Sequence, residues 1–176
     1  MSQNKMKHLF SLIIALLLAT AGLQAQNKLP SVTLETLKGD TINTTTLQNG
    51  GKPLVIIFFA TWCKPCMSEL KALKKAYPTW KKRTGVRMIA VSIDGPQTVG
   101  NVATIAKNGG WKFEVMLDRQ SRFAQLMDVQ MVPHMIILDG EGNIADVHTD
   151  FTAGHEEQIY KKIRAVVKTT PSTSKK

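Results

Sequence analysis

Apolar and polar residues alternate near the start of this chain and merge into one long apolar run further along. Positions 32–37 alternate, Lys38-Gly39-Asp40 has turn composition, and positions 41–43 can return as a second strand. This pattern predicts an N-terminal β-hairpin. Residues 54–60 are all apolar, so they predict an interior strand that is covered on both faces of a sheet.

A helical pattern follows this strand, from Cys66 to Lys82. At about 100° per residue, apolar side chains fall on one face and lysines on the opposite, solvent-exposed face. The apolar face consists of Cys66, Leu70, Leu73, Tyr77 and Trp80. Pro78 predicts that the helix kinks there or ends at Tyr77. Glu69 is the exception, because it is charged and yet lies at the edge of the apolar face, one turn after Cys66.

Short strands and helices alternate over the remainder of the chain. The expected strands cover 86–93, 113–117, 135–138 and 144–148, and the expected helices cover 97–107, 121–127 and 155–168. Ser121 is expected to cap the helix that begins there. The last helix is expected to face the core with Ile159, Ile163, Val166 and Val167. This order predicts an α/β fold with a central mixed sheet and helices on both of its faces.

Residues 1–25 have the composition of a secretory signal peptide. Lys5 and Lys7 form a basic start, residues 9–21 are predominantly apolar, and Ala25 is a small residue at a suitable cleavage point. The apolar run is shorter than the roughly 20 residues of a membrane-spanning helix, and the residues leave open whether the segment is cleaved or retained as an anchor. We therefore expect a domain over residues 26–168 and a disordered basic tail over 169–176, in a protein exported to the periplasm or cell envelope.

The formal net charge of +10 raises the question of nucleic-acid or membrane binding. The lysines are spread along helical faces and the tail, and aromatic residues are not interleaved with them. The sequence also contains no recognisable nucleic-acid module. We therefore expect no nucleic-acid partner, and membrane contact only through an uncleaved signal segment.

The chain has 2 cysteines, which stand together in Trp62-Cys63-Lys64-Pro65-Cys66, between the apolar strand and the helix. The free N–H groups and the dipole of a helix N-terminus favour the thiolate of the first cysteine. The positive charge of Lys64 is expected to lower the pKa of the Cys63 thiol further. Because a second cysteine one turn away can resolve a mixed disulfide, the pattern predicts reversible thiol–disulfide exchange.

Other uses of a cysteine pair fit the sequence less well. A structural zinc site needs four ligands, and His134, His148 and His155 are not at ligand spacing. Met67 follows Cys66, so the motif is not the Cys-x-x-Cys-His of haem attachment. We expect neither a metal nor another cofactor.

The segment Phe59-Ala60-Thr61-Trp62-Cys63-Lys64-Pro65-Cys66 resembles the active site of the thioredoxin superfamily. Residues 29–167 are similar to its exported TlpA/ResA-like thiol–disulfide oxidoreductases. Their Cys-x-x-Glu is matched by Cys66-Met67-Ser68-Glu69, and their proline loop by Val132-Pro133. The resemblance implies a thioredoxin-like fold with an N-terminal hairpin and an extra strand–helix unit, here between Val86 and Asp118.

The resemblance also implies roles for individual residues. Cys63 is expected to be the exposed nucleophile and Cys66 the buried resolving thiol, with Glu69 as a buried acid that tunes them. Pro133 is expected to be cis and to lie against the cysteine pair. The backbone of Val132 is expected to bind a partner protein.

Neighbouring positions add detail to this site. Ile57 stands where cytosolic thioredoxins carry a buried aspartate, which leaves Glu69 as the evident acid. Trp62 is expected to pack beside the motif, to shield one sulfur and to contribute to substrate binding. Met131 is a candidate partner contact, and His134 stands where threonine is common, which leaves the choice of partner open.

The implied function is the reduction of disulfides in exported proteins, including apocytochromes that await haem, with electrons from a membrane thiol donor. Lys64 and burial near Glu69 act in opposite directions on the reduction potential, so a thiol oxidant is an alternative. A copper-binding chaperone of the same fold is another, but those proteins use Cys-x-x-x-Cys with a distant histidine. A peroxidase would need Thr-x-x-Cys, whereas Thr61 is two residues before Cys63.

Overall fold

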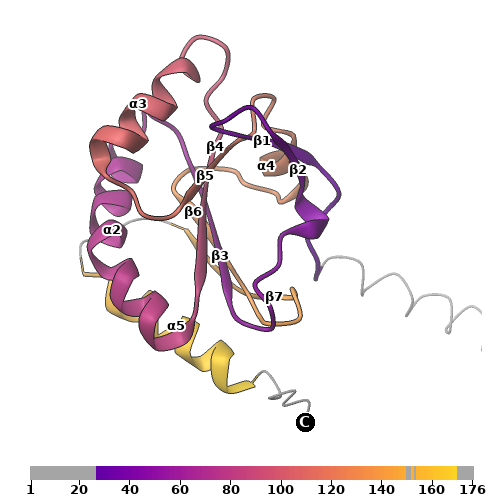
Figure 1. The fold of residues 1–176 in the computed structure, drawn as a ribbon, viewed down its shortest axis with the longest axis vertical. Helices are drawn as coiled ribbons and strands as arrows, with labels where there is room; N and C mark the ends of the chain where they lie inside the picture. Colours follow the sequence, from indigo (N-terminus) through magenta and orange to yellow (C-terminus); the bar gives the residue numbers. More distant parts are fainter. Residues whose placement is uncertain (1–26, 150–151, 153, 170–176) are drawn as a thin grey trace, which may run out of the picture.

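One mixed sheet organises the chain. The computed structural model describes residues 27–149, 152 and 154–169, so the expected signal peptide and the tail after Thr169 lie outside the described residues. The sheet has 7 strands in the order β2-β1-β5-β4-β3-β6-β7 (Figure 1). The strands are β1 (Thr33–Thr36), β2 (Thr41–Asn43), β3 (Leu54–Phe59), β4 (Arg87–Ser92), β5 (Glu114–Leu117), β6 (His134–Leu138) and β7 (Ile144–Thr149).

The long apolar run forms β3, which lies inside the sheet. β3 pairs in parallel with β4 and antiparallel with β6, and all of its residues are buried. Successive side chains of a strand point to opposite faces. Ile57 and Phe59 therefore join one apolar core, while Ile56 and Phe58 join the other. The predictions of an interior strand and of an N-terminal β1–β2 hairpin are both confirmed.

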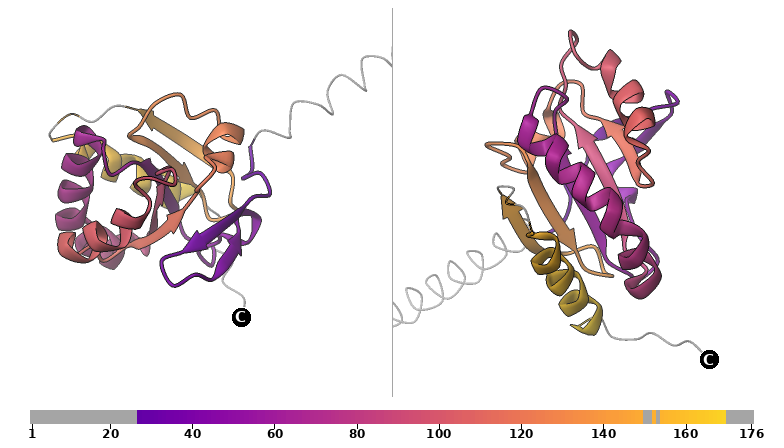
Figure 2. Two further views of the ribbon diagram at one scale, coloured as in Figure 1. Left: turned by 90° about the horizontal axis from the view of Figure 1, so that it is seen from above. Right: turned by 90° about the vertical axis from the view of Figure 1, so that its left-hand side faces the viewer.

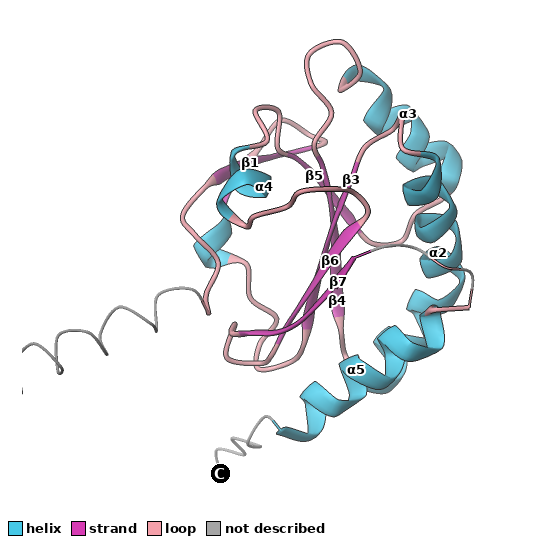
Figure 3. Ribbon diagram, turned by 180° about the vertical axis from the view of Figure 1, so that it is seen from behind, coloured by secondary structure: helices cyan, strands magenta, loops and turns pink. Residues whose placement is uncertain are grey.

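Helices cover both faces of the sheet, as expected, but unevenly. α2 (Lys64–Thr84), α3 (Gly100–Gly109) and α5 (Glu156–Thr169) lie on one face (Figure 1, Figure 2). The short α4 (Arg122–Leu126) lies on the other face. The β1–β2 hairpin forms one edge of the sheet, and the 3-10 helix η1 (Thr44–Thr46) follows it. Figure 3 shows α2 and α5 together on their side of the sheet, where they contact each other. Within the described residues, none of the helices combines the length and apolar character that crossing a bilayer requires.

α2 does not end at Tyr77, so the second of the two alternatives predicted for Pro78 is wrong. The helix continues through Pro78 to Thr84, although a proline in a helix interior costs about 3 kcal/mol. Buried aromatic residues on both sides of the proline offset this cost. Tyr77 and Trp80 both lie in the core, and Trp80 stacks on Tyr160 of α5 with ring centroids 5.7 Å apart.

Ser121 is the N-cap residue of α4, as expected, but its side chain does not cap the helix. Ser121 has a φ of 52° and its side chain makes no capping hydrogen bond. Instead, the Oδ2 atom of buried Asp118 accepts the N–H of Ala124 at 2.9 Å. The left-handed backbone at Ser121 turns the chain back so that Asp118 reaches the helix from the end of β5.

The inward face of α5 differs from the expected one at Val167. Ile159, Ile163 and Val166 are buried, but Val167 is 39% exposed. The half-buried Tyr160 packs against the core instead, because its ring lies flat on Trp80. The direction of the apolar face thus depends on where α2 places its aromatic side chains.

Candidate active site

The segment between β3 and α2 places both cysteines at the N-terminus of α2. Cys63 is the N-cap residue, with extended backbone, and its Sγ atom accepts the N–H of Cys66 at 3.2 Å. The two Sγ atoms are joined in a disulfide, so the structure shows the oxidised form. After reduction, the N–H groups and the dipole of α2 are positioned to favour a thiolate at Cys63.

Both cysteines are buried, so the expectation of an exposed Cys63 is wrong for the oxidised form. Cys63 is 6% exposed and Cys66 0%. The sulfur of Cys63 is covered because it is bonded to Cys66 and lies 3.6 Å from the carbonyl oxygen of Val132. Cys63 nevertheless retains some solvent contact, which attack on an external disulfide requires.

The loop before β6 forms the second side of the site. The peptide bond between Val132 and Pro133 is cis, as the resemblance implies. β3 and β6 are antiparallel, and Phe58 stands opposite His134 in their register. The residues that follow β3 and those that precede β6 therefore meet at the same end of these two strands, which explains why this loop reaches Cys63.

Two large apolar side chains next to these segments are open to solvent. Trp62 is 63% exposed and Met131 is 58% exposed. Trp62 occupies the turn closed by the Cys63 N–H and the Ala60 carbonyl, at 3.1 Å, and most of its surface faces water. The expectation that it shields one sulfur stays a prediction. Lys64 is also exposed. These side chains are available to an incoming molecule.

Glu69 is a buried acid one turn after Cys66, as expected. It is 2% exposed, and its Oε2 atom has no hydrogen-bond partner among the described residues. Burial, with a smaller contribution from the negative charge of Glu156, raises the pKa of Glu69 to about 7. Ile57 is fully buried in the same core, so that position offers no second acid.

His134 lies in the opposite core, away from the cysteines. Its ring stands edge-on to that of Phe58, with centroids 6.1 Å apart, and it is 8% exposed. Burial lowers the pKa of His134, although the negative charge of Asp128 acts in the other direction. The side chain is therefore a neutral, buried part of the structure near neutral pH, and it offers little surface to a partner.

Sequence reasoning missed Asp94, a fully buried aspartate next to the cysteine segment. Its Oδ2 atom accepts the N–H of Thr61 at 2.9 Å, and its Oδ1 atom accepts the Thr61 hydroxyl at 2.6 Å. A signal was present, because Asp94 directly follows an apolar strand, and polar residues at the carboxyl ends of parallel strands gather at functional sites.

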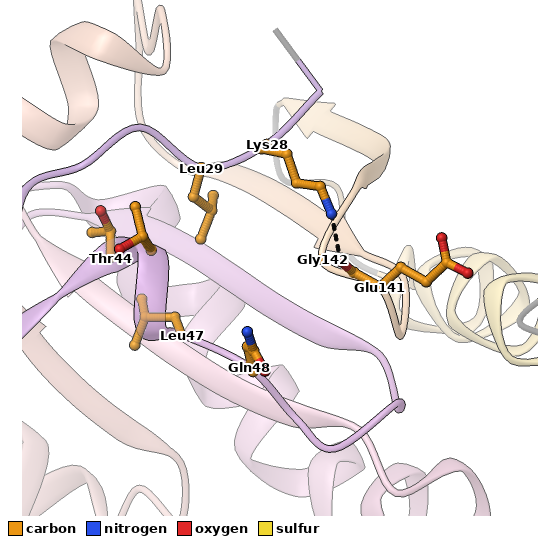
Figure 4. A pocket seen from close by; sticks show the side chains of 8 residues that line it. Lys28, Leu29, Thr44, Leu47, Gln48, Glu141 and Gly142 are labelled. Atoms are coloured by element: carbon orange, nitrogen blue, oxygen red, sulfur yellow. Dashed lines mark hydrogen bonds between the residues drawn. The ribbon is translucent and has the colours of Figure 1, made fainter. Parts of the chain in front are cut away.

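A surface pocket lies elsewhere on the molecule, beside the turn between β6 and β7 (Figure 4). Its lining includes Lys28, Thr44, Leu47 and Glu141, and the Lys28 ammonium donates to the Glu141 carbonyl at 2.6 Å. None of the predicted site residues lines it. Within the described part of the chain, His, Cys, Asp and Glu side chains form no group of three or more that could hold a metal ion.

Comparison with known proteins gives consistent similarities. Residues 25–147 match the AhpC/TSA family. The thiol-disulfide oxidoreductase ResA of Halalkalibacterium halodurans is 30% identical over 151 residues, which cover 86% of this chain and 79% of that protein. ResA of Geobacillus kaustophilus is 31% identical over 99 residues, and there the match covers 56% of this chain and only 55% of that relative.

A solved structure supports the fold. The solution structure of an uncharacterized thioredoxin-like protein from Porphyromonas gingivalis is 46% identical, with a TM-score of 0.71. The match covers 80% of this chain and 92% of that one. The expected thioredoxin-like fold is thereby confirmed.

Proposed function

This chain belongs to the AhpC/TSA family of thioredoxin-like proteins, and from that premise we propose that it is an exported thiol–disulfide oxidoreductase that reduces disulfides in other proteins. The observation that carries the proposal is the cysteine pair at the N-terminus of α2, with the Cys63 sulfur 3.6 Å from the carbonyl of Val132. The relatives named thiol-disulfide oxidoreductase ResA support the reaction class.

The reduced pair is the reacting form. The Cys63 thiolate attacks one sulfur of a substrate disulfide, a bond forms between them, and the other substrate sulfur leaves as a thiolate. The Cys66 thiolate then attacks the Cys63 sulfur, and the first substrate sulfur leaves. Two electrons pass to the substrate in this cycle, and the Cys63–Cys66 disulfide in the structure is the product.

Glu69 serves as the proton acceptor for this second step. Cys66 has no exposed surface, so its proton needs an acceptor inside the protein before the thiolate can attack. Glu69 lies one helical turn away, and its pKa of about 7 lets it take up and release a proton near neutral pH. The charge of Lys64 assists at Cys63 by favouring the thiolate there.

The substrate is an extended polypeptide segment with apolar residues near its disulfide. Trp62 and Met131 offer exposed apolar surface on the two segments that meet at Cys63. The backbone of Val132 supplies hydrogen-bonding groups beside Pro133. Aromatic side chains of this kind contribute much of the affinity at protein interfaces.

The proposed location of the protein outside the cytosol rests on residues 1–25, which have signal-peptide composition. The proposed electron source follows from that location. Outside the cytosol a thiol pair is not kept reduced by default. The cycle therefore needs a membrane thiol donor that returns two electrons to the pair. The substrates are then envelope proteins, with apocytochromes as one candidate class, and the chain touches the membrane itself only if the segment is retained.

Trapping tests the reaction. The Cys66→Ser variant should accumulate a mixed disulfide with an oxidised protein such as insulin, because the resolving thiol is missing. The matched Cys63→Ser variant should accumulate none. Trapping by both variants or by neither would contradict the assignment, and a tight stoichiometric Cu(I) complex with poor disulfide turnover would favour a copper chaperone.

The reduction potential of the pair tests the direction of electron flow. Equilibration with glutathione or dithiothreitol buffers gives this value directly. A potential near about −270 mV, as in thioredoxin, supports a reductant. A potential near about −120 mV would make the protein an oxidant, and the proposed direction would be wrong.

A further inference from the structure

The buried carboxylate of Asp94 accepts several hydrogen bonds, and two of them come from the segment that carries Cys63. It is fully buried just after β4, where both carboxylate oxygens accept hydrogen bonds. Thr61 donates twice, through its N–H at 2.9 Å and its hydroxyl at 2.6 Å. Ser92 donates its hydroxyl to Oδ2 of the same carboxylate at 2.8 Å.

Thr61 is the first central residue of the turn that carries Cys63. The Cys63 N–H donates to the Ala60 carbonyl at 3.1 Å and closes this turn. β3 ends at Phe59 and α2 begins at Lys64, so Thr61 belongs to neither element. Because Thr61 donates two hydrogen bonds to one carboxylate, both the position and the orientation of Thr61 are restricted.

We propose that Asp94 is a positioning residue for thiol–disulfide exchange: it holds Thr61 and thereby fixes the turn that places the Cys63 sulfur at the N-terminus of α2. This inference rests on the proposed function of the cysteine pair. Hydrogen bonds to an ionised acceptor are stronger than those between neutral groups. The carboxylate therefore holds the turn more firmly than a neutral side chain of the same shape.

Asp94 stays ionised despite its burial. Burial by itself raises the pKa of Asp94, but the hydrogen bonds that its carboxylate accepts, those from Thr61 first, outweigh it and hold this pKa below its usual range. A buried negative charge near Cys63 would disfavour the thiolate. The charge of Asp94 thus does not favour the Cys63 thiolate, and Asp94 contributes only by holding the turn in place. Replacing Asp94 itself would change the charge and the turn geometry together.

The test therefore alters Thr61 and leaves the charge in place. Thr61→Val removes the hydroxyl donor, whereas Thr61→Ser retains it. Thr84→Val is the matched control, because the part-buried Thr84 hydroxyl donates to the Trp80 carbonyl at 2.7 Å at the other end of α2. The measurement is the rate of Cys63 alkylation by iodoacetamide against pH, in reduced protein, with the labelled residue identified by mass spectrometry.

Thr61→Val should slow alkylation at neutral pH about tenfold and shift the profile to higher pH, because the thiolate loses its place at the helix N-terminus. Thr61→Ser and Thr84→Val should remain within about twofold of the unmodified protein. A folded Thr61→Val protein with an unchanged profile would overturn the proposal, because the contact would then be only structural.

A second variant covers the case in which Thr61→Val does not fold. Ser92→Ala removes another donor to the same carboxylate from a buried residue of β4, outside the cysteine segment. It should slow alkylation in the same direction by about threefold, and an unchanged rate would overturn the proposal. Alkylation needs no disulfide substrate, so normal alkylation without disulfide turnover in the unmodified protein would reject the proposed function and not the role of Asp94.

Discussion

The Sγ atom of Cys63 lies 3.6 Å from the carbonyl oxygen of Val132, although the two residues are 69 positions apart in the chain. The antiparallel pairing of β3 with β6 produces this contact, because it sets Phe58 opposite His134. Under the proposed function, a disulfide that approaches Cys63 would meet the backbone of Val132 at the same time. The sheet would then place the reacting sulfur and the substrate-binding backbone side by side.

The exposed ring of Trp62 gives a prediction about substrate size. Trp62→Ala should raise the KM for a protein disulfide by about tenfold, since truncating an important interface residue costs roughly 1–2 kcal/mol. Reduction of a small disulfide such as glutathione disulfide should be unchanged. Steady-state kinetics with both substrates checks this. Leu37→Ala is the control, because Leu37 is an exposed apolar residue in the N-terminal hairpin; equal losses with both substrates would contradict a binding role for Trp62.

The raised pKa of Glu69 predicts that the stability of the oxidised protein depends on pH. The oxidised form is used because its cysteines do not titrate. The pKa of Glu69 is raised from 4.5 to about 7 in the folded state. Its contribution to stability is therefore full below pH 4.5 and is lost as the pH rises through about 7, a change of about 3 kcal/mol. Glu69→Gln removes this dependence and should become progressively more stable than the unmodified protein over that window.

Urea unfolding at a series of pH values measures this difference. Glu157→Gln is the matched control, because the Glu157 side chain is 77% exposed, and its stability should follow that of the unmodified protein. A constant difference between Glu69→Gln and the unmodified protein across the window would show that the burial of Glu69 does not carry this cost.

The stacking of Trp80 on Tyr160 gives a prediction about folding stability. Trp80→Ala removes a side chain that is 5% exposed and that joins α2 to α5, so the free energy of unfolding should fall by about 3–5 kcal/mol. Lys82→Ala, on the exposed face of the same helix, should change it by less than about 0.5 kcal/mol. Chemical denaturation measures both, and a small effect at Trp80 would mean that α2 relaxes to fill the space.

The N-terminus of α4 gives a paired prediction. Asp118→Ala leaves the buried N–H of Ala124 without its acceptor, so it should destabilise the protein by about 1–2 kcal/mol. Ser121→Ala should cost less than about 0.5 kcal/mol, because the Ser121 side chain caps nothing. Thermal or denaturant unfolding compares the two, and the reverse order would restore Ser121 as the cap.

Several features were predictable because residues close in the chain produce them. The buried face of α2 follows from helical periodicity, and the burial of β3 follows from its unbroken apolar run. The place of the cysteine pair follows from a strand that leads directly into a helix. The carboxylate of Glu69 was found for the same reason, since its position relative to Cys66 depends only on helical spacing.

The errors concern residues whose neighbours come from elsewhere in the chain. α2 continues past Pro78 and does not end at Tyr77, because Trp80 stacks on Tyr160 of α5. Cys63 is covered because the proline loop lies against it.

Asp94 shows most clearly what the sequence alone does not predict. Its proposed positioning role depends on hydrogen bonds from Thr61, which stands 33 positions earlier in the chain. By itself, the sequence determined which elements form and which residues can exchange a disulfide, because periodicity and thiol chemistry are local properties. Only the tertiary structure decided how far each sulfur is exposed and what holds the turn around it, because burial and hydrogen bonding between distant segments arise only when the sheet brings them together.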